Sequence, residues 1–199
     1  MNQNICYDRG IVYIHNPNAA GTCFRDWLGF EGQTELGFPT LTTHHVFWNK
    51  YKVVVAIRDP IDRALSSYRS LTSETYSGEL KRKYPSMHTW NTDKFFNTIL
   101  NDHLYICACQ YKYTQHLQSN KPPDYLVKTE NLDMESLSKG LDICEPFPGK
   151  KMAENKTPID IDEKLYLELI EYYKVDYLLF GYKPKSFKVF MEQQLAAAA

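Results

Sequence analysis

The fold of this chain is decided by the stretch Val53-Val54-Val55-Ala56-Ile57-Arg58-Asp59-Pro60. Its apolar residues follow one another without alternation, which predicts a strand buried on both faces. Asp59 is a favoured helix N-cap and Pro60 a favoured first helical residue, so a helix should begin at once and continue through Leu71. A buried strand that turns directly into a capped helix is typical of α/β proteins.

The same order of strand, loop and helix recurs along the chain. Residues 10–15 form a second unalternating run, followed by a loop of small residues at 16–21 and a short helix from Thr22. Four further elements are expected, namely a helix capped by Asp93, a strand at Tyr125–Lys128, a helix over 132–141 and a helix from near Asp162. Together they predict a central parallel sheet with helices on both faces.

The composition fits a globular protein and excludes several classes of function. Of 199 residues 43% are apolar, so we expect one domain over residues 1–195, with a disordered tail or expression scar at 196–199. A net charge of −1 gives no basic field for nucleic acid or an anionic membrane. The chain has no apolar run of about 18 residues, and we expect a cytoplasmic protein of microbial or viral origin. Its five cysteines form no CxxC pair, which favours reduced thiols and no metal site.

The loop after the first predicted strand has the composition of an anion-binding turn. It reads Asn16-Pro17-Asn18-Ala19-Ala20-Gly21-Thr22-Cys23. Small residues let backbone N–H groups approach an anion closely, and the helix N-terminus behind them adds partial positive charge. An ordinary tight turn is the alternative. The loop is not a Walker A motif, because Thr22 follows Gly21 where the lysine would stand.

A second candidate anion site follows the next strand and reads Arg58-Asp59-Pro60-Ile61-Asp62-Arg63-Ala64-Leu65-Ser66-Ser67-Tyr68. Arg58 leaves the carboxyl end of a strand, where α/β proteins bind ligands, and its planar guanidinium suits a phosphate. Ser66 follows about two helical turns later, and a sharp turn at Asp59 would let both side chains reach one phosphate. The alternative is a surface ion pair between Arg58 or Arg63 and the neighbouring aspartates.

Together the two motifs resemble those of sulfotransferases that use 3′-phosphoadenosine 5′-phosphosulfate (PAPS), in particular the glycan-type branch. The first motif of that family typically reads His-Ile-Pro-Lys-Thr-Gly-Gly-Thr-Ser, against residues 15–23 here. The second reads Arg-Asp/Asn-Pro-x-x-Arg-x-x-Ser-x-Tyr, which residues 58–68 match without a gap. Residues 127–132, 155–157 and 176–182 agree more loosely. The resemblance implies a three-layer P-loop-NTPase-like fold and a sulfuryl-transfer enzyme.

The resemblance also implies which residues bind the nucleotide donor. The first loop, Pro17-Asn18-Ala19-Ala20-Gly21-Thr22-Cys23, would hold the 5′-phosphosulfate, and Arg58 with Ser66 would hold the 3′-phosphate. Lys156, in the loop at 155–157, would close over the nucleotide. The product would be 3′,5′-bisphosphoadenosine (PAP), the acceptor a hydroxyl of carbohydrate class, and no metal would be required.

The sequence departs from the family at Asn18, where a lysine usually neutralises charge on the bridging oxygen. Asparagine can donate a hydrogen bond but carries no charge, and losing a charged donor costs about 3–4 kcal/mol, or 10²–10³ in rate. We therefore expect compensation by another cation, with Arg25 and Lys156 as candidates, or slow turnover, or binding alone.

The acceptor hydroxyl also needs a general base that works near neutral pH. His44 and His45 fall between the two motifs, where family members often place a histidine, and only one can face the site if the segment is extended. A surface or capping role is the alternative for each, and Glu130 is a third candidate base. For His15, at the end of the first strand, we expect a structural role toward the loop.

Two other functions remain open with a similar fold. A nucleotide kinase-like P-loop protein needs a Walker lysine and a magnesium-binding carboxylate after a strand, whereas the second strand here ends in Arg58. A non-catalytic nucleotide-binding relative would keep the motifs without turnover, and Asn18 favours it. The sequence leaves the acceptor, the choice of histidine and the oligomeric state open.

Overall fold

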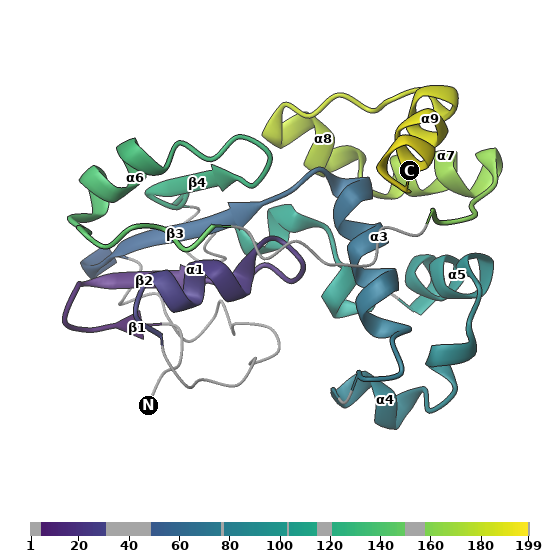
Figure 1. The fold of residues 1–199 in the computed structure, drawn as a ribbon, viewed down its shortest axis with the longest axis horizontal. Coiled ribbons are helices and arrows are strands. Elements are labelled where there is room, and N and C mark those ends of the chain that lie inside the picture. Colours follow the sequence, from purple (N-terminus) through teal and green to yellow (C-terminus); the bar gives the residue numbers. More distant parts are fainter. Residues whose placement is uncertain are drawn as a thin grey trace. The chain divides into compact units, whose positions relative to one another are not determined.

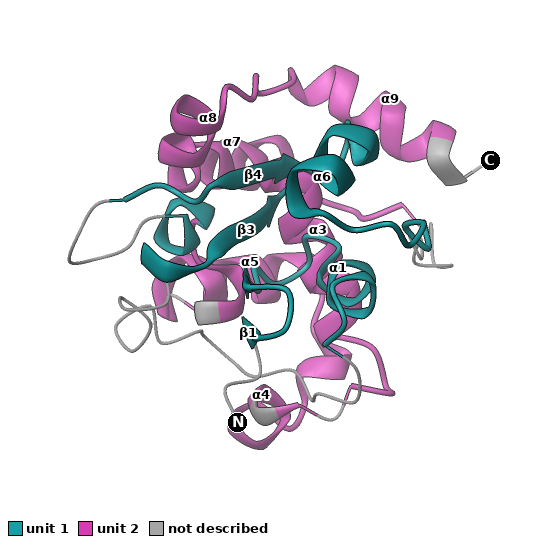
Figure 2. Cartoon of the chain, turned by 90° about the vertical axis from the view of Figure 1, so that its left-hand side faces the viewer, with its two compact units in different colours: residues 1–58, 110–151 teal, residues 59–109, 152–199 magenta. Residues whose placement is uncertain are grey.

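The computed structural model describes residues 5–30, 49–76, 78–102, 104–114, 121–149 and 158–198. The chain divides into two compact units, each assembled from two separate stretches of sequence (Figure 2). Unit 1 comprises residues 1–58 and 110–151, and unit 2 comprises residues 59–109 and 152–199. No helix in the described ranges is long and apolar enough to cross a membrane. The expectation of one domain over residues 1–195 stays a prediction.

Unit 1 is built on a four-stranded sheet whose strands lie in chain order, β1-β2-β3-β4 (Figure 1). They are β1 (Ile5–Cys6), β2 (Ile11–Ile14), β3 (Lys52–Ile57) and β4 (Tyr125–Lys128). β1 is antiparallel to β2, whereas β2, β3 and β4 are parallel to one another. Ile14 lies opposite Val55, and Ile57 lies opposite Lys128. This mostly parallel sheet confirms the α/β class and the three strands predicted from the sequence.

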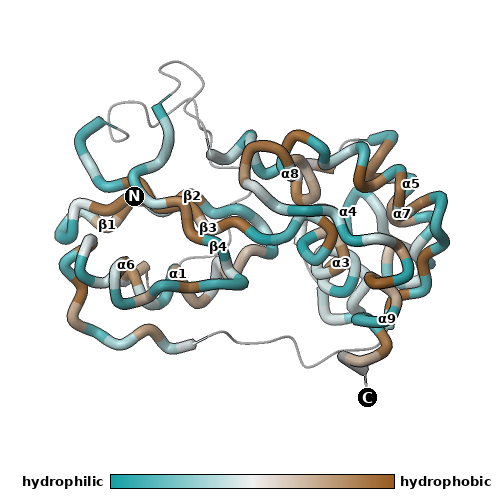
Figure 3. The backbone as a smooth tube through the Cα atoms, turned by 90° about the horizontal axis from the view of Figure 1, so that it is seen from above, coloured by the Kyte–Doolittle hydropathy of each residue, from teal (hydrophilic) through white to brown (hydrophobic). Residues whose placement is uncertain are grey.

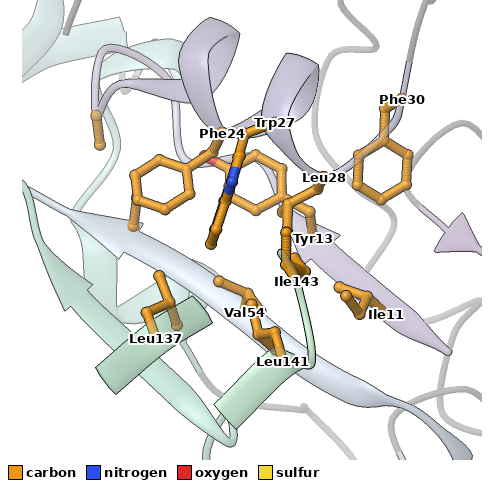
Figure 4. Packing of buried hydrophobic residues seen from close by; sticks show 12 residues of the cluster. Ile11, Tyr13, Phe24, Trp27, Leu28, Phe30, Val54, Leu137, Leu141 and Ile143 are labelled. Carbon is orange, nitrogen blue, oxygen red and sulfur yellow. The ribbon is translucent and has the colours of Figure 1, made fainter. Parts of the chain in front are cut away.

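Two helices of unit 1, α1 (Gly21–Trp27) and α6 (Met134–Leu141), share one apolar core with the sheet. In this cluster the ring of Tyr13 stacks on that of Phe24, with 5.9 Å between centroids (Figure 4). Trp27 meets the ring of Phe24 edge-on at 6.3 Å. Full burial of each such side chain contributes about 1.5–3 kcal/mol relative to exposure. Packing therefore holds α1, and the loop before it, against the sheet.

The other face of the central strands is buried as well. Val12 and Ile14 of β2, and Val53, Val55 and Ile57 of β3, have no exposed surface. Figure 3 shows apolar residues running along both strands. Burial on both faces explains why neither strand alternates between apolar and polar residues.

The described part of unit 2 is helical. It contains α3 (Pro60–Leu71), α4 (Glu79–Lys83), α5 (Thr92–Asp102), α7 (Glu163–Tyr172), α8 (Lys174–Phe180), α9 (Phe187–Ala198) and the 3-10 helices η1 (Met87–Thr89) and η2 (Tyr105–Cys107). A third 3-10 helix, η3 (Gln110–Tyr113), belongs to unit 1. The side chain of Asp59 accepts from the N–H groups of Ile61 at 3.0 Å and Asp62 at 3.1 Å, so the predicted cap of α3 is confirmed. Asp162 caps α7 through the N–H of Leu165 at 2.7 Å, also as predicted.

Some helix ends differ from the prediction. Asn91, rather than Asp93, caps α5, because its side chain accepts from a backbone N–H of the first turn at 3.0 Å. α6 begins later than expected, since Asp133 accepts from a first-turn N–H at 3.1 Å and serves as its cap. α9 extends to Ala198, where alanines favour a helix, and the expectation of a tail at 196–199 stays a prediction.

Arg63 is a buried charged residue of unit 2 that bonds backbone carbonyl groups. It is fully buried, and its guanidinium donates to the carbonyl oxygens of Ile106 and Cys107 at 3.4 Å and to that of Ala108. Its guanidinium carbon lies 5.8 Å from the centre of the Tyr173 ring, which adds a cation–π attraction. The alternative of a surface ion pair is therefore wrong for Arg63, which has a structural role.

Candidate functional site

The loop that joins β2 to α1 holds a constrained backbone. Asn18 and Ala20 have positive φ angles of 62° and 55°. The left-handed region costs most L-residues roughly 1–2 kcal/mol, although asparagine tolerates it better than alanine. Ala20 is the N-cap of α1, and its methyl group cannot accept a capping hydrogen bond. Such backbone recurs where N–H groups turn toward a ligand, which makes this loop a candidate site.

Gly21 is required by the packing of His15 beneath the loop. A Cβ atom at Gly21 would lie 2.2 Å from Nε2 and 2.3 Å from Cδ2 of His15, far inside van der Waals contact. The imidazole therefore occupies the space that a side chain at position 21 would need. His15 supports the first turn of α1 from the end of β2, in line with the structural role expected for it.

Arg58, the first residue of the second motif, contacts the first loop. It directly follows β3, which is the parallel neighbour of β2, so both loops leave the same edge of the sheet. Its Nη1 donates to the carbonyl oxygen of Asn18 at 3.4 Å. Among the described residues this neutral oxygen is the one acceptor of the guanidinium, and no carboxylate forms an ion pair with it. The group carries five N–H donors, so most of its capacity remains for an anion.

Gln110 joins the two motifs, and sequence reasoning missed it. Its Oε1 accepts from Nδ2 of Asn16 at 2.8 Å and from the backbone N–H of Arg58 at 2.9 Å. Its Nε2 donates to the carbonyl oxygen of Arg58 at 2.7 Å. Asn16 also donates to the carbonyl oxygen of Ala56 at 3.0 Å, and the side chains of Asn16 and Gln110 are fully buried. The available signal was weak, namely one amide residue between cysteines and tyrosines.

The end of β4 supplies a third segment at this edge of the sheet. The backbone N–H of Thr129 donates to the carbonyl oxygen of Ile57 at 2.9 Å, so pairing with β3 continues one residue beyond β4. Lys128 is half-buried at the end of β4, and Glu130 is exposed in the turn that follows. The strand that pairs with β3 therefore ends in a cation and is followed by a carboxylate.

No family model, curated protein or solved structure matches this chain. A proposal about function therefore rests on the residues of the loop, on Arg58 and on the amide side chains that join them.

The predicted donor-binding residues divide between the two units. Unit 1 holds the described residues Pro17, Asn18, Ala19, Ala20, Gly21, Thr22, Cys23 and Arg58. Thr22 is exposed and Cys23 is buried, so the hydroxyl of this pair faces solvent and the thiol faces the core. Ser66 lies on α3 in unit 2, so its pairing with Arg58 stays a prediction. His44, His45 and Lys156 lie outside the described residues, and their roles stay predictions as well.

Arg25, a candidate for the compensating cation, and the thiol of Cys107 are both constrained by their surroundings. Arg25 lies on α1 with Nε 3.7 Å from a carboxylate oxygen of Asp26, which offsets part of its charge. Burial raises the pKa of the Cys107 thiol to about 11, so this sulfur stays protonated at neutral pH. Within the described ranges, no group of three or more histidine, cysteine or acidic side chains could hold a metal ion.

Proposed function

We propose that this chain is a sulfotransferase that binds PAPS at the sheet edge of unit 1 and transfers its sulfuryl group to a hydroxyl of carbohydrate class. The observation that carries the proposal is the 3.4 Å hydrogen bond from Nη1 of Arg58 to the carbonyl oxygen of Asn18. It brings together two segments, 40 residues apart, that the sequence marks separately as anion-binding. A small-residue loop and a guanidinium at one edge form a suitable receptor for a phosphate-bearing ligand.

In the proposed reaction the acceptor hydroxyl oxygen attacks the sulfur atom in line with the bond to the 5′-phosphate. A new S–O bond forms, the old S–O bond breaks, and its electron pair leaves with PAP. The hydroxyl proton passes to a general base, for which His44, His45 and Glu130 are the candidates. The protein contributes mainly by aligning the two substrates and by stabilising charge on the leaving phosphate.

Arg58 is the cation proposed to compensate for asparagine at position 18. A charged donor directed at the leaving oxygen is worth about 3–4 kcal/mol, or 10²–10³ in rate. The Arg58 guanidinium contacts the backbone of Asn18 itself, whereas the guanidinium of Arg25 has a carboxylate neighbour. We therefore assign Arg58 to the phosphosulfate end of the donor in addition to the 3′-phosphate role that the family resemblance implies.

The proposal is tested first by ligand-dependent stability. PAP at 100 times its dissociation constant should raise the free energy of unfolding by about 2.7 kcal/mol, and AMP and ATP should do less at the same concentration. Arg58→Gln should reduce the shift to about 1.4 kcal/mol or less, while Arg82→Gln, an exposed arginine on α4, serves as the matched control and should retain it in full. Absence of any PAP-dependent shift in the unmodified chain would reject the proposal, and a larger shift with ATP would favour the kinase-like alternative.

A second candidate function is nucleotide binding without turnover, and the neutral side chain of Asn18 favours it. This candidate predicts the same PAP-dependent shift. The two are separated by incubating the chain with sulfur-labelled PAPS and a panel of glycan hydroxyls. Transfer of label supports the enzyme, whereas binding without transfer across the panel supports the binding protein.

A further inference from the structure

The side-chain amide of Gln110 lies between the two motifs of the proposed site. Four hydrogen bonds of 2.7–3.0 Å connect Gln110, Asn16, Ala56 and Arg58. These groups lie at the carboxyl ends of β2 and β3 and at the first residue of η3. The side chains of Asn16 and Gln110 have no exposed surface, so water does not compete for these bonds.

The pattern of donors and acceptors requires an amide at position 110. Gln110 presents an oxygen to the backbone N–H of Arg58 and an NH₂ group to the carbonyl oxygen of the same residue, at 2.9 and 2.7 Å. This reciprocal pair copies the bonding between two neighbouring strands and fixes the peptide groups on both sides of the Arg58 Cα. A carboxylate could accept but not donate, and an aliphatic side chain could do neither.

We propose that Gln110 is a positioning residue that couples the Asn16–Ala20 loop to Arg58, so that the two grip one phosphate group together. This inference rests on the proposed function. Gln110 bonds Asn16, which begins the loop, and Arg58, which supplies the guanidinium. Its contribution is to hold the backbone of both partners in register before the ligand arrives.

The binding test is a double-mutant cycle with PAP as the probe. Gln110→Leu and Arg58→Gln should each weaken PAP binding by about ten- to a hundredfold, and the double variant should be no weaker than the poorer single variant. Gln110→Met, which keeps the length of the side chain but neither donates nor accepts, should behave as Gln110→Leu does and provides a second variant if the leucine chain does not fold. Gln194→Leu is the matched control, since Gln194 accepts from Arg69 on α3 at 3.3 Å and has no part in the proposed site. Losses that multiply in the double variant would overturn the coupling.

A ligand-independent measurement separates this inference from the proposed function. Hydrogen exchange of the Arg58 backbone N–H should be slow in the unmodified chain and about tenfold or more faster in Gln110→Leu and Gln110→Met, neither of which keeps an acceptor for it, with no change in Gln194→Leu. Unchanged exchange at Arg58 in both Gln110 variants would overturn the positioning role, whether or not PAP binds. If PAP does not bind the unmodified chain but exchange at Arg58 still accelerates, the sulfotransferase proposal fails and the positioning role of Gln110 stands.

Discussion

Introducing a lysine at position 18 tests whether Arg58 supplies the charge that the loop lacks. A lysine there would restore the charged donor of the family pattern, worth about 3–4 kcal/mol in the transition state. Its ammonium group would, however, enter a loop whose Asn18 carbonyl already bonds the Arg58 guanidinium at 3.4 Å. At a separation of about 6 Å and an effective dielectric constant of about 20, the two cations repel by about 3 kcal/mol. The gain and the repulsion nearly cancel, so Asn18→Lys alone should raise turnover by less than about tenfold.

The same lysine should act differently once Arg58 is removed. Arg58→Gln should lower turnover by about 10²–10³, and adding Asn18→Lys to it should restore most of that loss because the repulsion is gone. The assay is the single-turnover release of PAP from PAPS, with a glycan panel or water as the acceptor. If the double variant is no faster than Arg58→Gln, the proposed role of Arg58 at the leaving phosphate is wrong.

Stability gives an independent control on that experiment. Asn18 has a φ of 62°, which asparagine tolerates better than lysine, so adding Asn18→Lys to Arg58→Gln, where the repulsion is absent, should cost about 1 kcal/mol. For a chain of this length the melting temperature should fall by about 2–4 °C. A much larger fall would mean that the variant disturbs the loop as a whole, and its kinetics would then be compared at a lower temperature.

Three further predictions concern the first turn of α1, the buried hydroxyl of Tyr13 and the cysteines. Gly21→Ala should displace the ring of His15 and cost about 1–3 kcal/mol by chemical unfolding, whereas Thr22→Ala, at the exposed neighbouring position, should change stability by less than about 0.5 kcal/mol. Tyr13→Phe should raise the free energy of unfolding by about 1 kcal/mol, because the buried Tyr13 hydroxyl has no hydrogen-bond partner among the described residues. The same burial raises the pKa of Tyr13 well above its usual value. A loss of stability would point to a hydrogen bond that the described residues do not make. Alkylation followed by mass spectrometry at pH 9 should label the exposed Cys144 and spare Cys107, whose pKa of about 11 keeps its thiol protonated there. As the pH rises from 9 to 11 the folded state should lose stability, because the Cys107 thiol loses its proton at a lower pH in the unfolded chain than in the folded one.

Local signals in the sequence were sufficient for the central elements of the fold. The unalternating run before Arg58 predicted β3, and the pair Asp59-Pro60 predicted the start of α3, because burial on both faces and capping act on neighbouring residues. β1 was not predicted, since two residues are too few to show a period. Asn91 was overlooked as a cap because Asp93, in the first turn of α5, offers the same chemistry.

The candidate site was less accessible to sequence reasoning than the fold. The loop and Arg58 could be named because small residues and an arginine at strand ends have a direct chemical meaning. Gln110 could not be found, because its bond to Asn16 joins positions 94 residues apart and nothing local marks either amide as buried. Arg63 shows the same limit, since its acceptors lie more than 40 residues along the chain and a charged side chain is usually exposed.

The order of the strands along the chain has a consequence for synthesis on the ribosome. β3 and β4 are neighbours in the sheet, yet residues 58–124 separate them. At about 5–20 residues per second, the ribosome needs roughly 3–14 s to deliver β4 after β3 has been made. Throughout that delay the nascent β3 lacks the partner for one edge, and an unpaired strand edge rich in valine is prone to pair with another chain.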